Sequence, residues 1–415
     1  MKNGRVNFDY LETRDPEQRE LALFNMLPSL LARTIREAPG WASHLKGLDP
    51  SSVTSREALA KLPVMRKFSL KDMQALTPPL GGFPTSDLKS LNRVFMSPGP
   101  IFEPEGHGTD WWRSARALFS AGFRKGDVVM NTFAYHLTPG AWIVDAGARA
   151  LGCTVIPAGP ENTEQHVEVI AHLQPTAYVG VPNYLKILLD KAADAGKDTS
   201  SLQRALVSGG ALLPSLRQEY LDRKIFVFQV YATADAGMIA YESEALEGMI
   251  VDEGVLLEIV RPGTGDPLPP GEVGEVLVTT FNRDYPMIRL ATGDLSAVLP
   301  GMSPCGRTNM RIRGWMGRAN QVVKVKGFLI HAQHVAKIAK RFPQLGRLRL
   351  VVGRDGTQDT MVLKAEAIHY EQQLAEKIAK ALEKITQVVG AVQLVPPKTL
   401  PNDGIVVDDE RRDHV

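Results

Sequence analysis

Apolar and amphipathic segments alternate along the middle of this 415-residue chain, and that alternation restricts its fold more than any other feature. The short apolar segments DVVMNTF (127–133) and TAYVGVP (176–182) are each followed by a segment of helical period, AWIVDAGARALGC (141–153) and NYLKILLDKAADAG (183–196). Strands that alternate with helices of this length predict right-handed βαβ units and a parallel sheet. In such sheets the loops at the carboxyl ends of the strands bind ligands, so these loops are the first candidates for a functional site.

Three other regions depart from this central pattern. Residues 17–38 have apolar positions at helical spacing interrupted by Pro28, which predicts a pair of helices that pack on the main body. Residues 249–281 contain short apolar runs joined by Gly- and Pro-rich turns, which predicts an antiparallel sheet or small barrel. After Gly327, helical and strand-like segments predict a small α+β unit near the usual minimum size of a domain. The predicted class is therefore α/β, with parallel βαβ sheets, a small β-subdomain and a separate α+β domain.

Composition and charge exclude several classes of protein. A formal net charge of +2 gives no electrostatic argument for binding nucleic acid or an anionic membrane surface. No apolar run approaches the roughly 18–20 residues that span a bilayer, and the first residues lack the apolar core of a secretion signal. Cys153 and Cys305 have no C-x-x-C partner, and each is typical of a small buried hydrophobic residue. We therefore expect a cytoplasmic enzyme without nucleic-acid or membrane partners.

Two motifs in the last third of the chain point to a nucleotide. In RLATGDL (289–295), Asp294 follows Gly293 in a predicted tight turn, and a carboxylate held there can accept two hydrogen bonds from the vicinal hydroxyls of a ribose. In GRANQVVKVKG (317–327), Arg318 precedes a predicted strand with two lysines. Cations next to a ribose-type carboxylate indicate an anionic nucleotide site. For either motif alone, a turn aspartate or a strand with solvated lysines is a competing interpretation.

The two motifs resemble the R-x-x-T-G-D-L element and the GR-x-D-D-x-[IV]-K-x-x-G hinge of the adenylate-forming enzymes, and they are most similar to the phenylacetate-CoA ligase branch. The resemblance covers nearly the whole chain. It implies an AMP-binding core domain at residues 1–318, with a β-subdomain at about 249–316, and a mobile C-terminal lid domain at residues 319–415. The lid would rotate about Asn320, where the hinge usually has aspartate, between the poses for adenylation and for thioester formation.

The resemblance also implies an activity and its cofactors. With ATP and Mg²⁺, an AMP-forming ligase would convert an aromatic or short-chain organic acid to an acyl-adenylate, and the thiol of coenzyme A would then displace AMP. The partners would be a small carboxylic acid and CoA, and since relatives often dimerise, a homodimer is one expectation. Some relatives bind a structural zinc through cysteines and a histidine; these are absent from MIAYESEALEG (238–248), so no zinc is expected.

The resemblance further assigns roles to individual residues. Tyr231 would stack on adenine, and Asp235 would stand where a glutamate normally binds Mg²⁺. The residues implied as catalytic are Asp235 and Lys326. Those implied for nucleotide binding are Ser97, Gly99, Gly209, Gly210, Ala211, Tyr231, Ala232, Asp294 and Arg318. Those implied for the acyl and CoA pocket are Tyr135, His136, Gly237 and Gly327.

The phosphate loop departs from the family pattern. Residues 93–108 lie where the family has S-S-G-T-T-G-x-P, whose hydroxyls and backbone N–H groups surround the phosphates of ATP. Glu103 and Glu105 add negative charge, and a carboxylate about 4 Å from a phosphate oxygen would cost on the order of 4 kcal/mol. Either these glutamates point away, or triphosphate is not held here in the usual way. The residues that replace the Thr-Thr-Gly core are Pro100, Ile101 and Phe102.

The C-terminal tail is the second departure. The family usually has Gly-Lys where this chain has Gly404 and Ile405, and loss of one such preorganised cation typically costs about 10²–10³ in rate. Two alternatives to a CoA ligase therefore stay open. One is a degenerate member that binds a nucleotide or an acyl-CoA without ATP-dependent ligation. The other is an enzyme that uses a preformed adenylate or transfers the acyl group to a carrier protein. The lysines that could replace the missing one are Lys324, Lys326 and Lys398.

Overall fold

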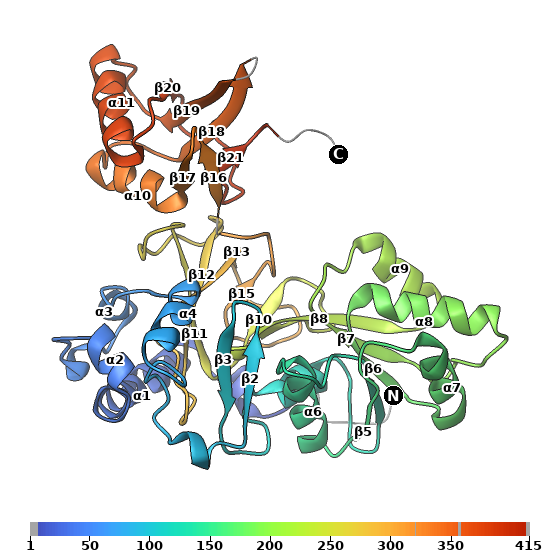
Figure 1. Cartoon of the computed structure of the whole chain (residues 1–415). Helices are drawn as coiled ribbons and strands as arrows, with labels where there is room; N and C mark the ends of the chain where they lie inside the picture. Colours follow the sequence, from blue (N-terminus) through green and yellow to red (C-terminus); the bar gives the residue numbers. More distant parts are fainter. Residues whose placement is uncertain (1–6, 320, 356–357, 412–415) are drawn as a thin grey trace. The chain divides into compact units, whose positions relative to one another are not determined.

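The computed structural model describes residues 7–319, 321–355 and 358–411, which form two compact units (Figure 1). The first unit comprises residues 1–257, 278–290 and 299–314, and the second comprises 258–277, 291–298 and 315–415. The predicted boundary between Arg318 and Ala319 falls inside the second unit, and its role as a hinge stays a prediction. Asn320 lies outside the described residues.

The main sheet has nine strands in the order β14-β15-β10-β9-β8-β7-β6-β4-β5, and the five strands from β8 to β5 are parallel. The predicted parallel sheet is thus confirmed. The remaining neighbours, from β8 through β9 and β10 to β15, pair antiparallel. The strands are β4 (Val128–Asn131), β5 (Thr154–Pro157), β6 (Ala177–Gly180), β7 (Arg204–Val207), β8 (Phe226–Thr233), β9 (Gly237–Tyr241), β10 (Met249–Val251), β14 (Val298–Leu299) and β15 (Arg311–Ile312).

Helices cover both faces of the parallel part of the sheet. Successive residues of each strand point to opposite faces, so one strand contributes side chains to both cores. Val129 of β4 packs in one core with α5 (Ser114–Ser120) and α6 (Gly140–Ala150). Its neighbour Met130 packs in a second core on the other face. The strands are therefore buried on both sides, which explains their continuous apolar runs. The helices of the second core are α7 (Thr163–Leu173), α8 (Pro182–Asp194) and α9 (Pro214–Asp222).

The predicted pair of helices at residues 17–38 is wrong, because α1 (Pro16–Glu37) runs through Pro28 as a single helix. Asp15 caps its start by accepting hydrogen bonds from the N–H groups of Glu17 and Gln18. A proline removes one hydrogen bond of the helix, but the buried apolar face on both sides of it holds the helix together. The other short elements of this layer are η1 (Tyr10–Thr13), α2 (Pro39–His44), η2 (Pro50–Ser52), α3 (Arg56–Leu59), β1 (Met65–Arg66), α4 (Lys67–Leu76) and η3 (Leu88–Ser90).

The predicted β-rich region and the α+β unit are both present. A four-stranded sheet has the order β1-β13-β12-β11, with β11 (Val255–Val260), β12 (Gly274–Thr280) and β13 (Leu290–Ser296). In the C-terminal part, a sheet of order β20-β19-β18-β21 shares one core with two helices. The elements of that part are β16 (Val322–Val325), β17 (Phe328–His331), α10 (Ala332–Arg341), β18 (Leu348–Asp355), β19 (Gln358–Glu366), α11 (Gln372–Thr386), β20 (Ala391–Val395) and β21 (Val407–Asp409).

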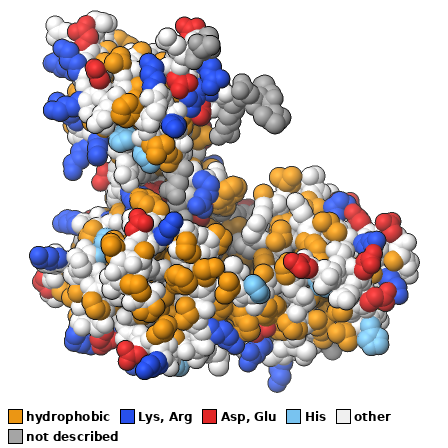
Figure 2. Space-filling model, viewed as in Figure 1, with side chains coloured by type: hydrophobic (Ala, Val, Ile, Leu, Met, Phe, Trp, Pro, Cys, Tyr) orange, Lys and Arg blue, Asp and Glu red, His pale blue; other side chains and the backbone are white. Residues whose placement is uncertain are grey.

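The surface carries side chains of all kinds. In Figure 2, hydrophobic, basic and acidic side chains are mixed over the face that is shown. Among the described residues, no helix has both the length and the apolar character that crossing a membrane requires.

Candidate functional site

The segment predicted as a phosphate loop is a β-hairpin, in which β2 (Arg93–Ser97) pairs antiparallel with β3 (Ile101–Glu105). The hydroxyl of Ser97, opposite Ile101, is buried and donates a hydrogen bond to the Glu103 carboxylate. Gly99 lies in the turn, where the two flanking prolines offer no N–H group. Phosphate binding by Ser97 and Gly99 stays a prediction.

Both glutamates of the hairpin point inward. They are two residues apart on β3 and therefore lie on the same face of the strand. Glu103 is fully buried, and Glu105 is buried and accepts a hydrogen bond of 2.6 Å from the Arg93 guanidinium. Of the two arrangements that the sequence left open, the structure shows the one in which the glutamates are directed into the protein.

Helix α4 connects this hairpin to Asp235. The Gln74 side chain forms two hydrogen bonds of 2.8 Å with the backbone N–H and C=O of Phe102, which extends the pairing of β3. Two turns earlier on the helix, Lys67 Nζ lies 2.5 Å from Asp235 Oδ2. Asp235 lies between β8 and β9 and is fully buried. The motifs gave no signal for the contact between Lys67 and Asp235, since these two residues are 168 positions apart in the sequence.

Glu103, Asp235 and Lys67 form a cluster in which both carboxyl groups are buried and the ammonium side chain is 25% exposed. Burial, and after it the charge of Asp235, raise the pKa of Glu103 to about 8. The Glu103 carboxyl is therefore mostly protonated at neutral pH, since two buried carboxylates beside one cation are strongly disfavoured. The cluster then holds one negative charge on Asp235 and one positive charge on Lys67.

The Asp235 carboxylate in this cluster fits a hard divalent cation. Its Oδ1 is a buried oxygen for which the described part of the chain offers no hydrogen-bond partner. Oxygen ligands are those that Mg²⁺ prefers, and it commonly takes the rest of its six ligands from water and phosphate. The described residues contain no group of three or more His, Cys, Asp or Glu side chains that could hold a metal alone. A metal bound at Asp235 would therefore depend on ligands from a bound phosphate or water.

The parallel sheet brings several other predicted residues to one edge. The loop with Tyr135 and His136 follows β4, and the loop with Gly209, Gly210 and Ala211 follows β7. Both loops leave the carboxyl ends of strands in the same parallel set, so they lie on the side where ligands bind. At Gly209, φ is +72°, a conformation that glycine adopts without strain.

Tyr135 is held by polar contacts, whereas its neighbour is exposed. The Tyr135 hydroxyl accepts a hydrogen bond of 2.8 Å from Asn131 Nδ2 and donates one of 3.1 Å to Asp145 Oδ1. Burial, and then the charge of Asp145, raise the pKa of Tyr135 well above its ordinary value. His136 is exposed, and no hydrogen bond to its ring is present within the described residues. Their roles in an acyl or CoA pocket stay predictions.

The strand end near Asp235 is tightly packed. Tyr231 and Ala232 lie on β8, where the pairing with β9 shifts register between them, and Tyr231 is buried. At Gly237, where φ is +71°, an added Cβ would lie 2.9 Å from Cδ1 of Trp112. Gly237 therefore permits the close approach of the indole to the strand. Adenine stacking by Tyr231 and a pocket role for Gly237 stay predictions.

The second unit brings Asp294 and Arg318 together, as the two motifs led us to expect. Asp294 Oδ1 accepts hydrogen bonds from Arg318 Nη1 at 2.6 Å and from Trp315 Nε1 at 3.1 Å. The predicted turn at Gly293 is wrong, because both it and Asp294 lie within β13, a strand that is buried along its whole length. The positive φ of Gly293, +76°, is an irregularity inside that strand. No motif of the sequence indicated Trp315.

The predicted lysine strand is present as β16, but its last lysine lies in the turn that follows the strand. Lys326 and Gly327, with φ values of +48° and +90°, form the two-residue turn between β16 and β17. The Lys326 backbone N–H lies 3.4 Å from Asp359 Oδ2. In the tail, the Ile405 N–H donates to Asp403 Oδ1 at 2.9 Å, and the Gly404 carbonyl accepts from Gln321. A catalytic role for Lys326 and a pocket role for Gly327 stay predictions.

Comparisons with known proteins agree with this architecture. A family model described as "AMP-binding enzyme" matches residues 109–282. The chain is 27% identical to a phenylacetate-coenzyme A ligase of Thermus thermophilus, over 94% of this chain and 95% of that protein. It is 29% identical to a phenylacetate-coenzyme A ligase of Aromatoleum evansii, over 81% of this chain and 80% of that protein. An open conformation of 2-hydroxyisobutyryl-CoA ligase in complex with 2-HIB-AMP and CoA has the same fold, with a TM-score of 0.74 and 22% identity, and the match covers 97% of this chain and 93% of that one.

Proposed function

Because the chain belongs with the phenylacetate-CoA ligase-like branch of the adenylate-forming enzymes, we propose that it is an AMP-forming acid–CoA ligase. The carboxylate of an aromatic or short-chain organic acid would attack the α-phosphorus of ATP, giving an acyl-adenylate and releasing pyrophosphate. The thiol of CoA would then attack the acyl carbon, and AMP would leave. The observation that carries the proposal is the similarity to a named ligase over nearly the full length of both chains.

The inward glutamates support ATP use despite the altered phosphate loop. The sequence suggested that Glu103 and Glu105 would repel a triphosphate. Glu103 is buried and mostly protonated at neutral pH, and Glu105 is neutralised by Arg93. Neither carboxyl therefore presents an uncompensated charge to a phosphate, and the expected cost of about 4 kcal/mol falls away.

Asp235 is the residue that we propose for holding Mg²⁺. When bound, Mg²⁺ would neutralise phosphate charge. Lys67 orients the Asp235 carboxylate through Oδ2, and it leaves Oδ1 without a hydrogen bond in the described structure. The Gln74 contacts to Phe102 fix the hairpin beside this carboxylate, so its geometry is set before a ligand binds.

In the second unit, we propose that Asp294 accepts hydrogen bonds from ribose hydroxyls while Arg318 and Trp315 hold its orientation. Two donors already fix Oδ1, and a carboxylate has acceptor capacity for more. Coenzyme A as the acceptor, rotation about Asn320, a homodimer and a cytoplasmic location belong to the same proposal. One observation favours the alternative of a binding protein without ligase activity: Ile405 occupies the position of the usual tail lysine.

Acid-dependent exchange of labelled pyrophosphate into ATP tests the first step, with a panel of aromatic and short-chain acids. The proposal predicts exchange with at least one acid, and thioester formation when CoA is added. Asp235→Asn should abolish most of the exchange, whereas Asp222→Asn, at an exposed position, should leave it unchanged. AMP or CoA binding without exchange for any acid would favour the binding-protein alternative.

A further inference from the structure

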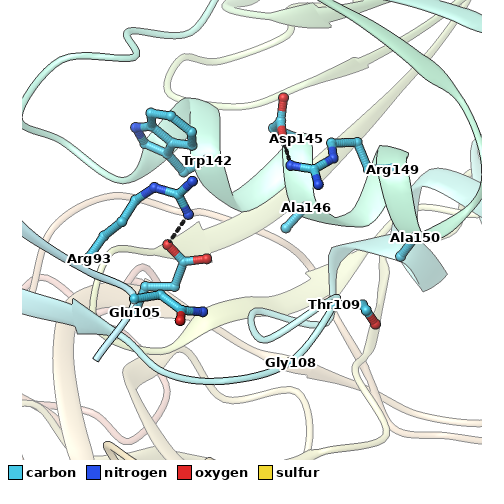
Figure 3. Close-up of a pocket in the computed structure, with 10 residues that line it drawn as sticks. Arg93, Glu105, Gly108, Thr109, Trp142, Asp145, Ala146, Arg149 and Ala150 are labelled. Carbon is cyan, nitrogen blue, oxygen red and sulfur yellow. Dashed lines mark hydrogen bonds and ion pairs between the residues drawn. The ribbon is translucent and has the colours of Figure 1, made fainter. Parts of the chain in front are cut away.

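A pocket of about 580 Å³ lies between the β2–β3 hairpin and helix α6 (Figure 3). Its volume is in the range of small-molecule sites. Arg93, Glu105 and Gly108 of its lining belong to the segment 93–108, but none of the residues named individually above for the acid, the nucleotide, the metal or CoA lines it. In Figure 3 the side chains of Arg93 and Arg149 extend toward each other from opposite sides of the pocket. These two guanidinium groups are its main chemical feature.

Arg93 is held rigidly on one side. Its guanidinium carbon lies 4.1 Å from the centre of the Trp142 ring, and Nη1 donates a hydrogen bond of 2.6 Å to Glu105. Among the described residues, Glu105 is the only hydrogen-bond acceptor for this guanidinium. Because a guanidinium has five N–H groups, Arg93 keeps donors for a ligand in a side chain that is already oriented.

Arg149 is held weakly on the other side. Its only ionic partner among the described residues is Asp145, at an N–O distance of 3.5 Å, and its side chain is 67% exposed. Asp145 also accepts the hydrogen bond from the Tyr135 hydroxyl, so this carboxylate keeps a donor if Arg149 turns away. The free energy needed to release Arg149 from Asp145 to a ligand is therefore small.

The carboxylates of Glu105 and Asp145 also line the pocket, but they are less exposed than the guanidinium groups. The side chains of Glu105 and Asp145 are 7% and 12% exposed, whereas those of Arg93 and Arg149 are 40% and 67% exposed. A molecule in the pocket would thus meet the guanidinium groups first, and each of them is oriented by the carboxylate beside it. Thr109, which also lines the pocket, offers a hydroxyl donor.

We propose that this pocket binds the phosphate group of a small phosphate ester. A tetrahedral phosphate has three terminal oxygens, so it can accept hydrogen bonds from two guanidinium groups on opposite sides and from a hydroxyl. A planar carboxylate has only two oxygens in one plane, so it offers fewer acceptor atoms to three donors that surround it. The ligand would draw Arg149 from Asp145, and Asp145 would stay bonded to Tyr135 in the loop that follows β4.

Isothermal titration calorimetry of the full chain in phosphate-free buffer tests this site, with ribose 5-phosphate as the probe and inorganic phosphate as a second arm. We expect binding, and Arg149→Met should weaken it about 10-fold or more, since a hydrogen bond to a charged group is lost. Arg149 is exposed, so this variant should fold. Arg36→Met is the matched control, because the Arg36 side chain is also 67% exposed and also lies beside a carboxylate, and it should bind like the wild type.

A tighter interaction with ribose 5-phosphate than with inorganic phosphate would identify an ester as the natural ligand, and equal binding would identify free phosphate. Binding should also change the fluorescence of Trp142, and Trp142→Phe should remove that change, since Arg93 packs on this ring. The proposal is overturned if neither probe binds at millimolar concentration. Equal binding by Arg149→Met and wild type, or equally tight binding of succinate, would overturn it as well.

Discussion

Replacing Glu103 with glutamine should remove most of the pH dependence that this carboxyl gives to the stability of the protein. The pKa of Glu103 is raised from its ordinary value of 4.5 to about 8, first by burial and then by the charge of Asp235. Between these two values the folded protein holds a proton that the unfolded chain has released. The contribution of Glu103 to the free energy of unfolding is therefore fully present below pH 4.5 and is lost as the pH rises through about 8.

The size of the effect follows from the two pKa values. Their difference, 8 minus 4.5, corresponds to on the order of 5 kcal/mol in total, at about 1.4 kcal/mol for each pH unit. Between about pH 6 and about pH 9, the wild type should lose about 2–3 kcal/mol of unfolding free energy through this group. Glutamine has nearly the same shape, can accept the hydrogen bond from Ser97 and carries no charge. Over the same pH range, the variant should therefore lose no unfolding free energy through residue 103.

Urea unfolding at a series of pH values gives the difference between Glu103→Gln and the wild type, in which the contributions of all other groups largely cancel. That difference should grow in favour of the variant as the pH rises. Glu105→Gln is the matched control, because Glu105 lies two residues away on the same buried face of β3. The control should lose stability through its lost contact with Arg93 and should keep the wild-type slope. If the curves of Glu103→Gln and the wild type run parallel, the buried, protonated state of Glu103 is refuted.

Three further substitutions test the packing and the site. Lys67→Met should lower the free energy of unfolding by about 2–3 kcal/mol, because the buried carboxylate of Asp235 loses its cation. The expected loss is moderate because solvent partly screens the Lys67 ammonium group. Urea titration should show that adding Asp235→Asn recovers part of this loss. Asp294→Ala should weaken AMP binding about 10-fold or more, because hydrogen bonds to a carboxylate are lost, and calorimetry that finds equal affinity would contradict the ribose role. Gly237→Ala should cost about 1–3 kcal/mol, since its Cβ would meet Trp112 and its φ is positive; an unchanged melting temperature would contradict this.

The periodicity of the sequence was enough to predict the parallel sheet. Strands such as β4 and β6 are buried on both faces, so their sequences are continuous apolar runs that local reading detects. The sequence pattern gave the wrong prediction at Pro28, where the helix continues because its buried face outweighs the loss of one hydrogen bond. It also failed at Asp294, where Gly293 indicated a turn but lies within a buried strand.

The candidate site was only partly predictable, for a different reason. Asp294 and Arg318 could be assigned to one site because both belong to recognisable motifs, although the hydrogen bond between them was not predicted. The contact of Lys67 with Asp235 could not be predicted, since it joins a helix of the N-terminal layer to a turn of the main sheet, 168 residues away. The inward direction of Glu103 and Glu105 depends on a strand that the three prolines of the segment concealed. Contacts of this kind leave no periodic trace in a single sequence.

The position of Lys67 has a consequence for protein engineering. One end of α4 neutralises Asp235, and the other end, through Gln74, is bonded to β3. A chimaera with a relative that exchanges residues 77–415 but keeps the native N-terminal segment would combine an ammonium group and a carboxylate from different parents. Recombination libraries of this protein should therefore transfer α4 together with β2, β3 and the turn between β8 and β9, as one inherited block.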